Sequence, residues 1–96
     1  MLSLQELRSK RHDVSAIASR YGAKNIRVFG SVARGELTEN SDIDLLVEFE
    51  PGRGLLAHAA LIRELEQYLG CKVDVASKNG LKERIRARVL AEAVPL

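Results

Sequence analysis

The chain has 96 residues, of which 46% are hydrophobic and 29% charged, and its formal net charge is +2. A chain of this length buries one modest core, so we expect one ordinary soluble domain spanning residues 1–96. Its apolar runs are far shorter than the roughly 20 residues that cross a bilayer, and its N-terminus lacks the apolar core of a secretory signal. Its single cysteine, Cys71, excludes an internal disulfide. We therefore expect a cytoplasmic protein without a membrane role.

The first 30 residues predict a helix followed by a strand. Apolar residues recur at helical spacing from Leu4 to Ala18, with charged residues between them, and Gly22 is placed to end the helix. The segment "NIRVFG" (residues 25–30) is short, β-branched and aromatic, and it stops at a glycine, which is typical of a strand.

A turn and a second strand follow. Residues 31–36 have the length of one helical turn, and "GELTEN" (residues 35–40) is rich in turn-forming residues. The segment "DIDLLVEFE" (residues 42–50) alternates with the period of a strand. One of its faces is entirely hydrophobic and the other is mainly acidic: Ile43, Leu45, Val47 and Phe49 share the first, and Asp42, Asp44, Leu46 and Glu48 share the second.

The rest of the chain predicts a helix, a strand and a last helix. "PGRG" (residues 51–54) breaks the chain, and apolar residues at helical spacing then continue to Gly70. "CKVDVA" (residues 71–76) alternates as a third strand, and an apolar stripe predicts a helix over residues 81–93, which Pro95 ends. The predicted order of elements is α-β-β-α-β-α.

The connections between the predicted strands indicate how they pair. A crossover of helical length joins the second strand to the third, which favours parallel pairing with a right-handed crossover. A compact loop of about ten residues joins the first two strands, which favours antiparallel pairing. We therefore expect an α/β (α+β) domain with a small mixed three-stranded sheet packed with helices. This pairing brings Gly30 and Ser31, at the end of the first strand, to the same edge as Asp42 and Asp44.

The aspartates at that edge are candidate metal ligands. Asp42 and Asp44, two residues apart on one strand, project from the same face with Cα atoms roughly 6.6 Å apart, so both can bind one hard cation. Oxygen ligands of this kind select Mg²⁺ or Mn²⁺. Parallel pairing would place Asp74 of the third strand beside Asp44. Three such carboxylates suit two Mg²⁺ ions and a phosphoryl or nucleotidyl transfer, in which Asp74 also helps to take the proton of the attacking hydroxyl.

The glycine and serine that follow the first strand are candidate phosphate ligands. Gly30 allows a ligand to approach the backbone closely, and Ser31 begins a helical turn whose free N–H groups and hydroxyl can bind phosphate oxygens. Arg34, one turn later, adds a cation. Each feature alone has an ordinary explanation as a turn or a surface charge, and the combination at this spacing is what favours a nucleotide site.

The segment "FGSVARGELTENSDIDLLVEF" (residues 29–49) resembles the signature of the DNA polymerase β-type nucleotidyltransferase superfamily. From residue 21 to residue 94 the chain is similar to the minimal nucleotidyltransferases, which are antitoxins of small helical HEPN toxins. The resemblance implies a polymerase β-like fold and Mg²⁺-dependent transfer of AMP from ATP to a tyrosine of the cognate toxin. It also implies that Gly30 and Ser31 bind the triphosphate and that Asp42, Asp44 and Asp74 form the metal triad.

Other functions stay open at this point. A non-catalytic antitoxin could neutralise its partner by binding alone, and a nucleotidyltransferase subunit could act on RNA or a small molecule. Five basic residues between Lys78 and Arg88, against the single acid Glu83, are most simply a solvated helix face, although they could also contact the nucleotide or an acidic partner. A nucleic-acid partner is not expected from a net charge of +2, and the sequence leaves nucleotide preference and homo-oligomer formation undecided.

Overall fold

The computed structural model describes residues 2–36 and 42–96, so most of the turn predicted at residues 35–40 lies outside the described residues. The N-terminal segment forms two helices, α1 (Leu4–Ser9) and α2 (Arg11–Arg20). A capping box begins α1, since the Ser3 hydroxyl accepts the Glu6 N–H and the Glu6 carboxylate accepts the Ser3 N–H.

The prediction of one continuous N-terminal helix is wrong at Lys10. The backbone leaves helical geometry there, with φ −104° and ψ 10°. Leu7 and Val14, on either side of the break, are both completely buried. Because residues seven apart also share a face of an unbroken helix, the hydrophobic spacing gives no sign of the break.

Three strands lie where they were predicted: β1 (Ala23–Phe29), β2 (Ile43–Phe49) and β3 (Val73–Ser77). β1 pairs with β2 antiparallel and β2 pairs with β3 parallel, which confirms the predicted mixed sheet. The sheet has a fourth strand, β4 (Val94–Pro95), and the order β3-β2-β1-β4. The prediction of three strands is therefore wrong by one.

The fourth strand owes its position to the free edge of β1. Val94 pairs antiparallel with Val28, and the Leu96 N–H donates to the Ile26 carbonyl oxygen at 3.1 Å. Arg8 of α1 adds a hydrogen bond to the Pro95 carbonyl oxygen at 2.9 Å. Two residues cannot show alternation in sequence, and a proline occurs readily at a sheet edge, so β4 is a product of tertiary pairing.

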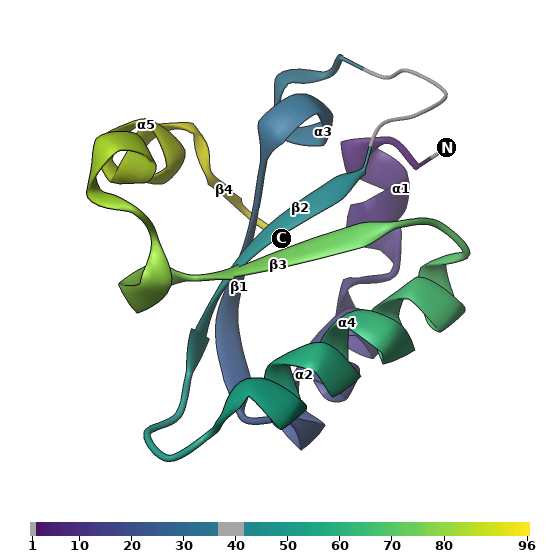
Figure 1. Ribbon diagram of the computed structural model, residues 1–96. Helices are drawn as coiled ribbons and strands as arrows, with labels where there is room; N and C mark the ends of the chain where they lie inside the picture. Colours follow the sequence, from purple (N-terminus) through teal and green to yellow (C-terminus); the bar gives the residue numbers. More distant parts are fainter. Residues whose placement is uncertain (1, 37–41) are drawn as a thin grey trace.

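The remaining helices complete two layers around the sheet (Figure 1). They are α3 (Gly30–Arg34), α4 (Leu55–Leu69), the short 3₁₀ helix η1 (Lys78–Gly80) and α5 (Glu83–Glu92). α1, α2 and α4 cover one side of the sheet, and α5 lies on the other side. Across residues 2–36 and 42–96, none of the helices is long and apolar enough to cross a membrane.

The hydrophobic core lies between the sheet and the layer formed by α1, α2 and α4. From β2 it takes Ile43, Leu45 and Val47, which are at most 1% exposed, as the alternation predicts. From the helices it takes Leu7, Val14, Ile17, Leu61 and Leu65. Leu46 and Val89 are also buried but lie outside this cluster, so the acidic face of β2 is apolar in its middle and polar only near its start and end.

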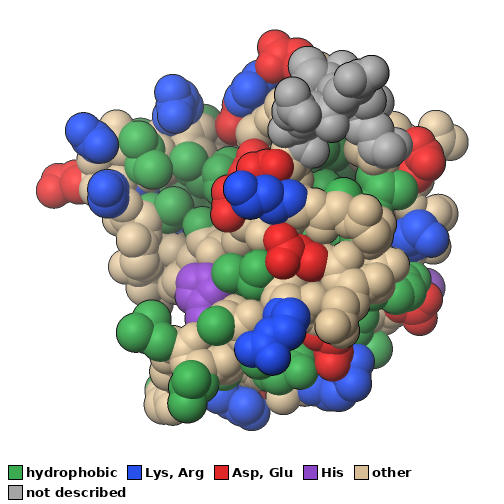
Figure 2. Space-filling view, turned by 45° about the vertical axis from the view of Figure 1, so that its right-hand side comes forward, with side chains coloured by type: hydrophobic (Ala, Val, Ile, Leu, Met, Phe, Trp, Pro, Cys, Tyr) green, Lys and Arg blue, Asp and Glu red, His purple; other side chains and the backbone are tan. Residues whose placement is uncertain are grey.

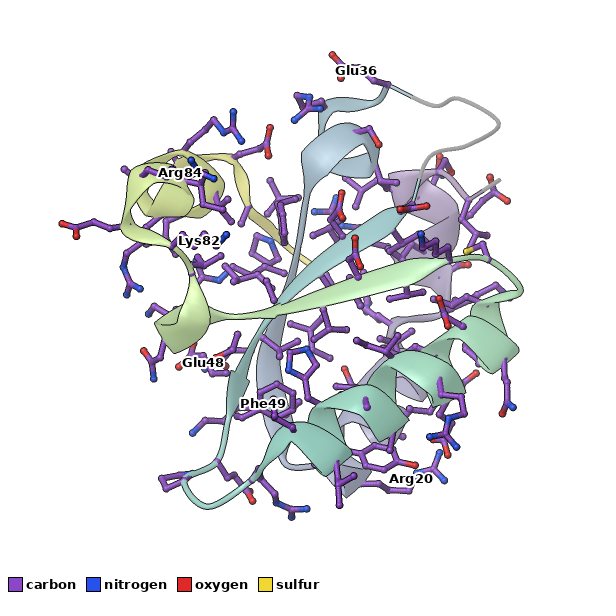
Figure 3. The ribbon with its side chains drawn as sticks, in the orientation of Figure 1. Arg20, Glu36, Glu48, Phe49, Lys82 and Arg84 are labelled. Carbon is purple, nitrogen blue, oxygen red and sulfur yellow. The ribbon has the colours of Figure 1, made fainter. Side chains whose placement is uncertain are left out.

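Of the two histidines, His58 packs inside the described structure and His12 lies at the surface. His58 of α4 places its Nε2 2.6 Å from the Val75 carbonyl oxygen, and its ring lies 5.2 Å from that of Phe49, which Figure 3 labels near the start of α4. His12 is exposed. Cys71 is half-buried against the core. His58 thus ties α4 to β3 and steadies the strand that carries Asp74.

The core makes a specific prediction for two leucines of α4. Leu65 is 1% exposed and Leu56 is 89% exposed. Replacing Leu65 by alanine should lower the free energy of unfolding by about 2–4 kcal/mol, because a cavity replaces packed methyl groups. The control Leu56→Ala should change it by less than about 0.5 kcal/mol. Chemical denaturation measures both, and equal effects would contradict this description of the core.

Candidate active site

The ends of three neighbouring strands meet at one place. Asp44 pairs with Phe29, the last residue of β1, and on its other side with Asp74 of β3. Gly30 and Ser31 follow Phe29 directly, and Asp42 immediately precedes β2. The structure therefore brings together the glycine-serine turn and the three aspartates that the sequence singles out.

Gly30 is held against Asp44 by a backbone that only glycine adopts without strain. Its φ is +75°, in the left-handed region. A Cβ atom built on Gly30 would lie 2.2 Å from Oδ2 of Asp44, well inside van der Waals contact. The absence of a side chain is therefore required twice, by the dihedral angle and by the neighbouring carboxylate.

Asp44 is the most perturbed carboxyl group of the site. Burial is the largest cause, and the charges of Asp74, then Asp42, add to it; together with a smaller contribution from Glu92 they raise the pKa of Asp44 from 3.8 to about 6, against a weak opposing effect of Arg34. The repulsion among these acids is the reverse of what a purely structural aspartate would experience. A bound cation would relieve it.

The donor set fits a hard cation. All three side chains offer carboxylate oxygens, which suit Mg²⁺, and the charges of Asp74 and Asp42 both act on Asp44. Among residues 2–36 and 42–96, however, no three acidic, His or Cys side chains already stand in a geometry that could hold a metal ion. The carboxylates are thus neighbours at one sheet edge and not a preassembled cage.

A residue that the sequence analysis missed, Glu92, completes the site. One of its carboxylate oxygens, Oε2, accepts the backbone N–H of Gly30 at 2.9 Å. The other, Oε1, accepts a hydrogen bond from Nη1 of Arg34. These contacts hold the pKa of Glu92 below its ordinary value, with the Arg34 hydrogen bond as the larger cause. A lone glutamate at the end of a helix carries no motif, and only the return of the chain into β4 places it here.

Arg34 therefore already binds carboxylates. Its Nε donates to Oε2 of Glu36 at 2.8 Å, in addition to the contact with Glu92. Both hydrogen bonds raise the pKa of Arg34 further above its ordinary value. Figure 2 shows basic side chains beside acidic ones near the middle of one face, in keeping with such pairs. Arg34 lies one turn after Gly30, as predicted, and its guanidinium is directed to an oxyanion.

Some basic side chains in and next to α5 are exposed to solvent, and one forms a hydrogen bond within the protein. Lys82, Arg84 and Arg88 are exposed, and Figure 3 labels the first two at the start of α5. Arg86 instead donates from Nη1 to the Lys78 carbonyl oxygen at 2.8 Å, which fixes η1 against α5. The prediction of a solvated helix face holds for the exposed three.

The family model described as a nucleotidyltransferase domain matches residues 13–96. The chain belongs to this nucleotidyltransferase family. Among relatives of the nucleotidyltransferase, the protein adenylyltransferase MntA of Thermococcus cleftensis is 43% identical over 96 residues, covering 98% of this chain and 96% of its own. A Methanocaldococcus jannaschii relative, MJ0435, which carries a provisional name as a protein adenylyltransferase, is 41% identical over 93 residues and covers 97% of both chains.

Solved structures agree with this assignment. A structure described as a minimal nucleotidyltransferase has a TM-score of 0.86 at 54% identity, covering 99% of this nucleotidyltransferase and 97% of that chain. A toxin-antitoxin structure determined with AMP-PNP has a TM-score of 0.76 at 21% identity, covering 88% of this chain and 69% of that one. At that identity the second likeness shows the fold alone.

The contact between Gly30 and Asp44 leads to a prediction with a matched control. Gly30 and Gly35 have nearly equal φ values, +75° and +76°, but a Cβ on Gly35 meets nothing within 4 Å among residues 2–36 and 42–96. Both Gly→Ala changes should cost about 1–2 kcal/mol of unfolding free energy for the left-handed backbone. Gly30→Ala should cost about 1 kcal/mol more, because Asp44 must move. In an Asp44→Ala background this difference should vanish; persistence of the difference would show that another contact causes it.

The raised pKa of Asp44 predicts how the stability of the metal-free nucleotidyltransferase depends on pH. The folded state holds this proton up to a pKa of about 6, against 3.8 ordinarily, so stability should fall as pH rises between these values. Asp44→Asn should remove this component of the pH dependence. It should also be more stable than the wild type at pH 7.5 by about 1 kcal/mol, after allowance for solvent screening.

Thermal melts in chelator from pH 4 to pH 8 measure that difference, and carbon NMR of the Asp44 carboxyl measures the titration directly. An ordinary aspartate titration, together with a destabilised Asp44→Asn, would contradict the described electrostatics.

Proposed function

We propose that this nucleotidyltransferase transfers AMP from ATP to a hydroxyl group, a tyrosine, of a HEPN-type toxin and thereby acts as its antitoxin. The observation that carries the proposal is the carboxylate of Glu92, which the Gly30 N–H and the Arg34 guanidinium hold beside Asp44. An oxyanion bound next to a cluster of metal-binding carboxylates is the arrangement that a nucleotide phosphate and its cation need. The MntA relative, named a protein adenylyltransferase, supports the same reaction.

The phosphate-binding residues act at the end of β1. The Gly30 N–H donates to a phosphate oxygen, and Gly30 has no side chain to keep the phosphates at a distance. The Ser31 hydroxyl, half-buried at the start of α3, supplies a second donor. Arg34 supplies a cation through Nη1, the nitrogen that Glu92 occupies in the structure. Together they fix the triphosphate in one orientation relative to the aspartates.

The carboxylates act at the starts of β2 and β3. Asp42, Asp44 and Asp74 would hold Mg²⁺, in two ions, and these ions would neutralise phosphate charge and lower the pKa of the attacking hydroxyl. Asp74 is exposed, which leaves its carboxylate accessible to an acceptor from outside the chain. It accepts the proton of the acceptor hydroxyl as the oxygen attacks the α-phosphorus, and pyrophosphate leaves with the electrons of the broken P–O bond.

A partner protein supplies the acceptor in this proposal. The alignment with the MntA relative covers 98% of this chain and 96% of that protein, so the two match over nearly their whole lengths. Structures with the same fold include antitoxins solved together with their toxins, one of them with AMP-PNP. An exposed Asp74 at the rim of the sheet can meet a side chain that such a partner extends.

The intact mass of the partner tests this function. The wild-type protein, incubated with a candidate HEPN-type partner, ATP and Mg²⁺, should raise the mass of the partner by one or more AMP units. Asp44→Asn should abolish the increase, because it removes a ligand that lies between the other two aspartates. The control Asp13→Asn, on α2 and bound to the Tyr68 hydroxyl outside the site, should leave it unchanged.

The same experiment separates the alternatives. A partner that is inhibited in complex with the protein, yet keeps its mass when Mg-ATP is shown to bind, would establish neutralisation by occlusion. Labelled AMP found in RNA or in a small molecule would overturn the protein acceptor and keep the reaction class.

A further inference from the structure

Glu92 occupies the anion-binding donors of the site with a group of the protein itself. Its Oε2 accepts the Gly30 N–H at 2.9 Å, and its Oε1 accepts from Nη1 of Arg34. The side chain is 20% exposed, so the contact is sheltered but reachable by solvent. α3, which carries Gly30 and Arg34, and α5, which ends at Glu92, pack against each other (Figure 3).

The negative charges of the nearby aspartates disfavour the position of the Glu92 carboxylate. Glu92 adds to the negative field of Asp74 and Asp42 on the half-buried Asp44 carboxyl. A fourth acid beside three others is retained only because the Gly30 N–H and Arg34 compensate for the repulsion. An anion that arrives with bound cations is not repelled by the aspartates in this way. Such an anion can therefore compete with the Glu92 carboxylate for the Gly30 N–H and Arg34.

Glu92 also lies where α5 connects to β4. It is the last residue of α5, Ala93 is extended, and Val94 already belongs to β4. β4 and the Leu96 N–H hold the following residues to β1. Movement of the Glu92 side chain away from Gly30 would thus loosen the end of α5 while β4 stays paired.

We propose that the Glu92 carboxylate competes with nucleotide phosphate for the Gly30 and Arg34 donors. A nucleotide must displace Glu92 in order to bind, and this displacement releases the C-terminal end of α5. The proposal rests on the function proposed above, because it assigns the Gly30 and Arg34 donors to nucleotide phosphate. A backbone N–H has one hydrogen, so Gly30 cannot bind the carboxylate and a phosphate fully at once. Without nucleotide, Glu92 keeps the donors satisfied; with nucleotide, α5 changes its attachment.

Calorimetric titration with Mg²⁺ and α,β-methylene-ATP, whose α–β bridge resists AMP transfer, tests the competition. Glu92→Gln should bind this analogue about tenfold more tightly than the wild type, since one charge-assisted contact no longer has to be broken. Glu92→Asp keeps the charge but withdraws the carboxylate by about 1.5 Å, and it should also bind more tightly. The control Glu36→Gln removes an exposed acid that pairs with Arg34 but does not contact Gly30, and it should change the Kd by less than about twofold.

These variants separate displacement from a general effect of charge. Equal gains in Glu92→Gln and Glu36→Gln, with none in Glu92→Asp, would assign the effect to charge alone and overturn the proposal. Weaker binding by both Glu92 variants would make Glu92 a permanent brace that positions Arg34, which also overturns it.

Hydrogen exchange of wild-type peptides covering residues 83–96 tests the release without any substitution. The analogue should speed exchange at the end of α5, and exchange that is unchanged or slower would overturn the proposal. If neither the wild type nor Glu92→Gln binds the analogue, both the competitor and the nucleotide site fail. If both bind it with equal Kd, only the competitor fails, and AMP transfer to the partner remains open to the mass measurement.

Discussion

The strand register that places Asp44 between Phe29 and Asp74 is the constraint on which the site depends. Because side chains alternate along a strand, a slip of one residue would turn Asp44 into the core and Ile43 or Leu45 toward the ligand. The buried face of β2 prevents that slip, since Ile43, Leu45 and Val47 would all have to leave the core. The same hydrophobic contacts that stabilise the fold therefore fix the position of a candidate metal-binding carboxylate.

Two opposing electrostatic demands meet at this sheet edge. Burial and neighbouring acids disfavour the ionised form of Asp44, whereas the Gly30 N–H and Arg34 favour the ionised form of Glu92. The acids and the donors lie on adjacent strand ends, so a ligand with negative oxygens and bound cations satisfies both at once. In the structure, the Glu92 carboxylate occupies the Gly30 N–H and Arg34 donors.

Sequence periodicity predicted those parts of the fold that repeat over several residues. The alternation in β2 and the helical spacing in α4 extend over many positions and are dominated by burial, so their boundaries agree closely with the structure. The break at Lys10 was missed because Leu7 and Val14 also fit one unbroken helix. β4 was missed because only its pairing with β1 makes two residues a strand.

In the candidate site too, residues in local motifs could be predicted, whereas a residue placed by tertiary contacts could not. Gly30, Ser31 and the aspartates form short motifs with a fixed spacing, so they could be selected before their positions were known, and the crossover between β2 and β3 predicted that Asp74 would join them. Glu92 could not be selected in this way. Its role depends on a contact with Gly30, 62 positions earlier in the chain, and local sequence does not indicate that contact.

The close approach of Gly30 to Asp44 also bears on how this family can change over time. A side chain at position 30 collides with the carboxylate at position 44, so the two positions cannot drift independently. Replacement of the glycine while Asp44 is present forces the carboxylate of this candidate metal ligand to move. Because the left-handed backbone at position 30 favours glycine on its own, replacement of Asp44 relieves only one of the two constraints, and we expect the glycine to outlast the aspartate.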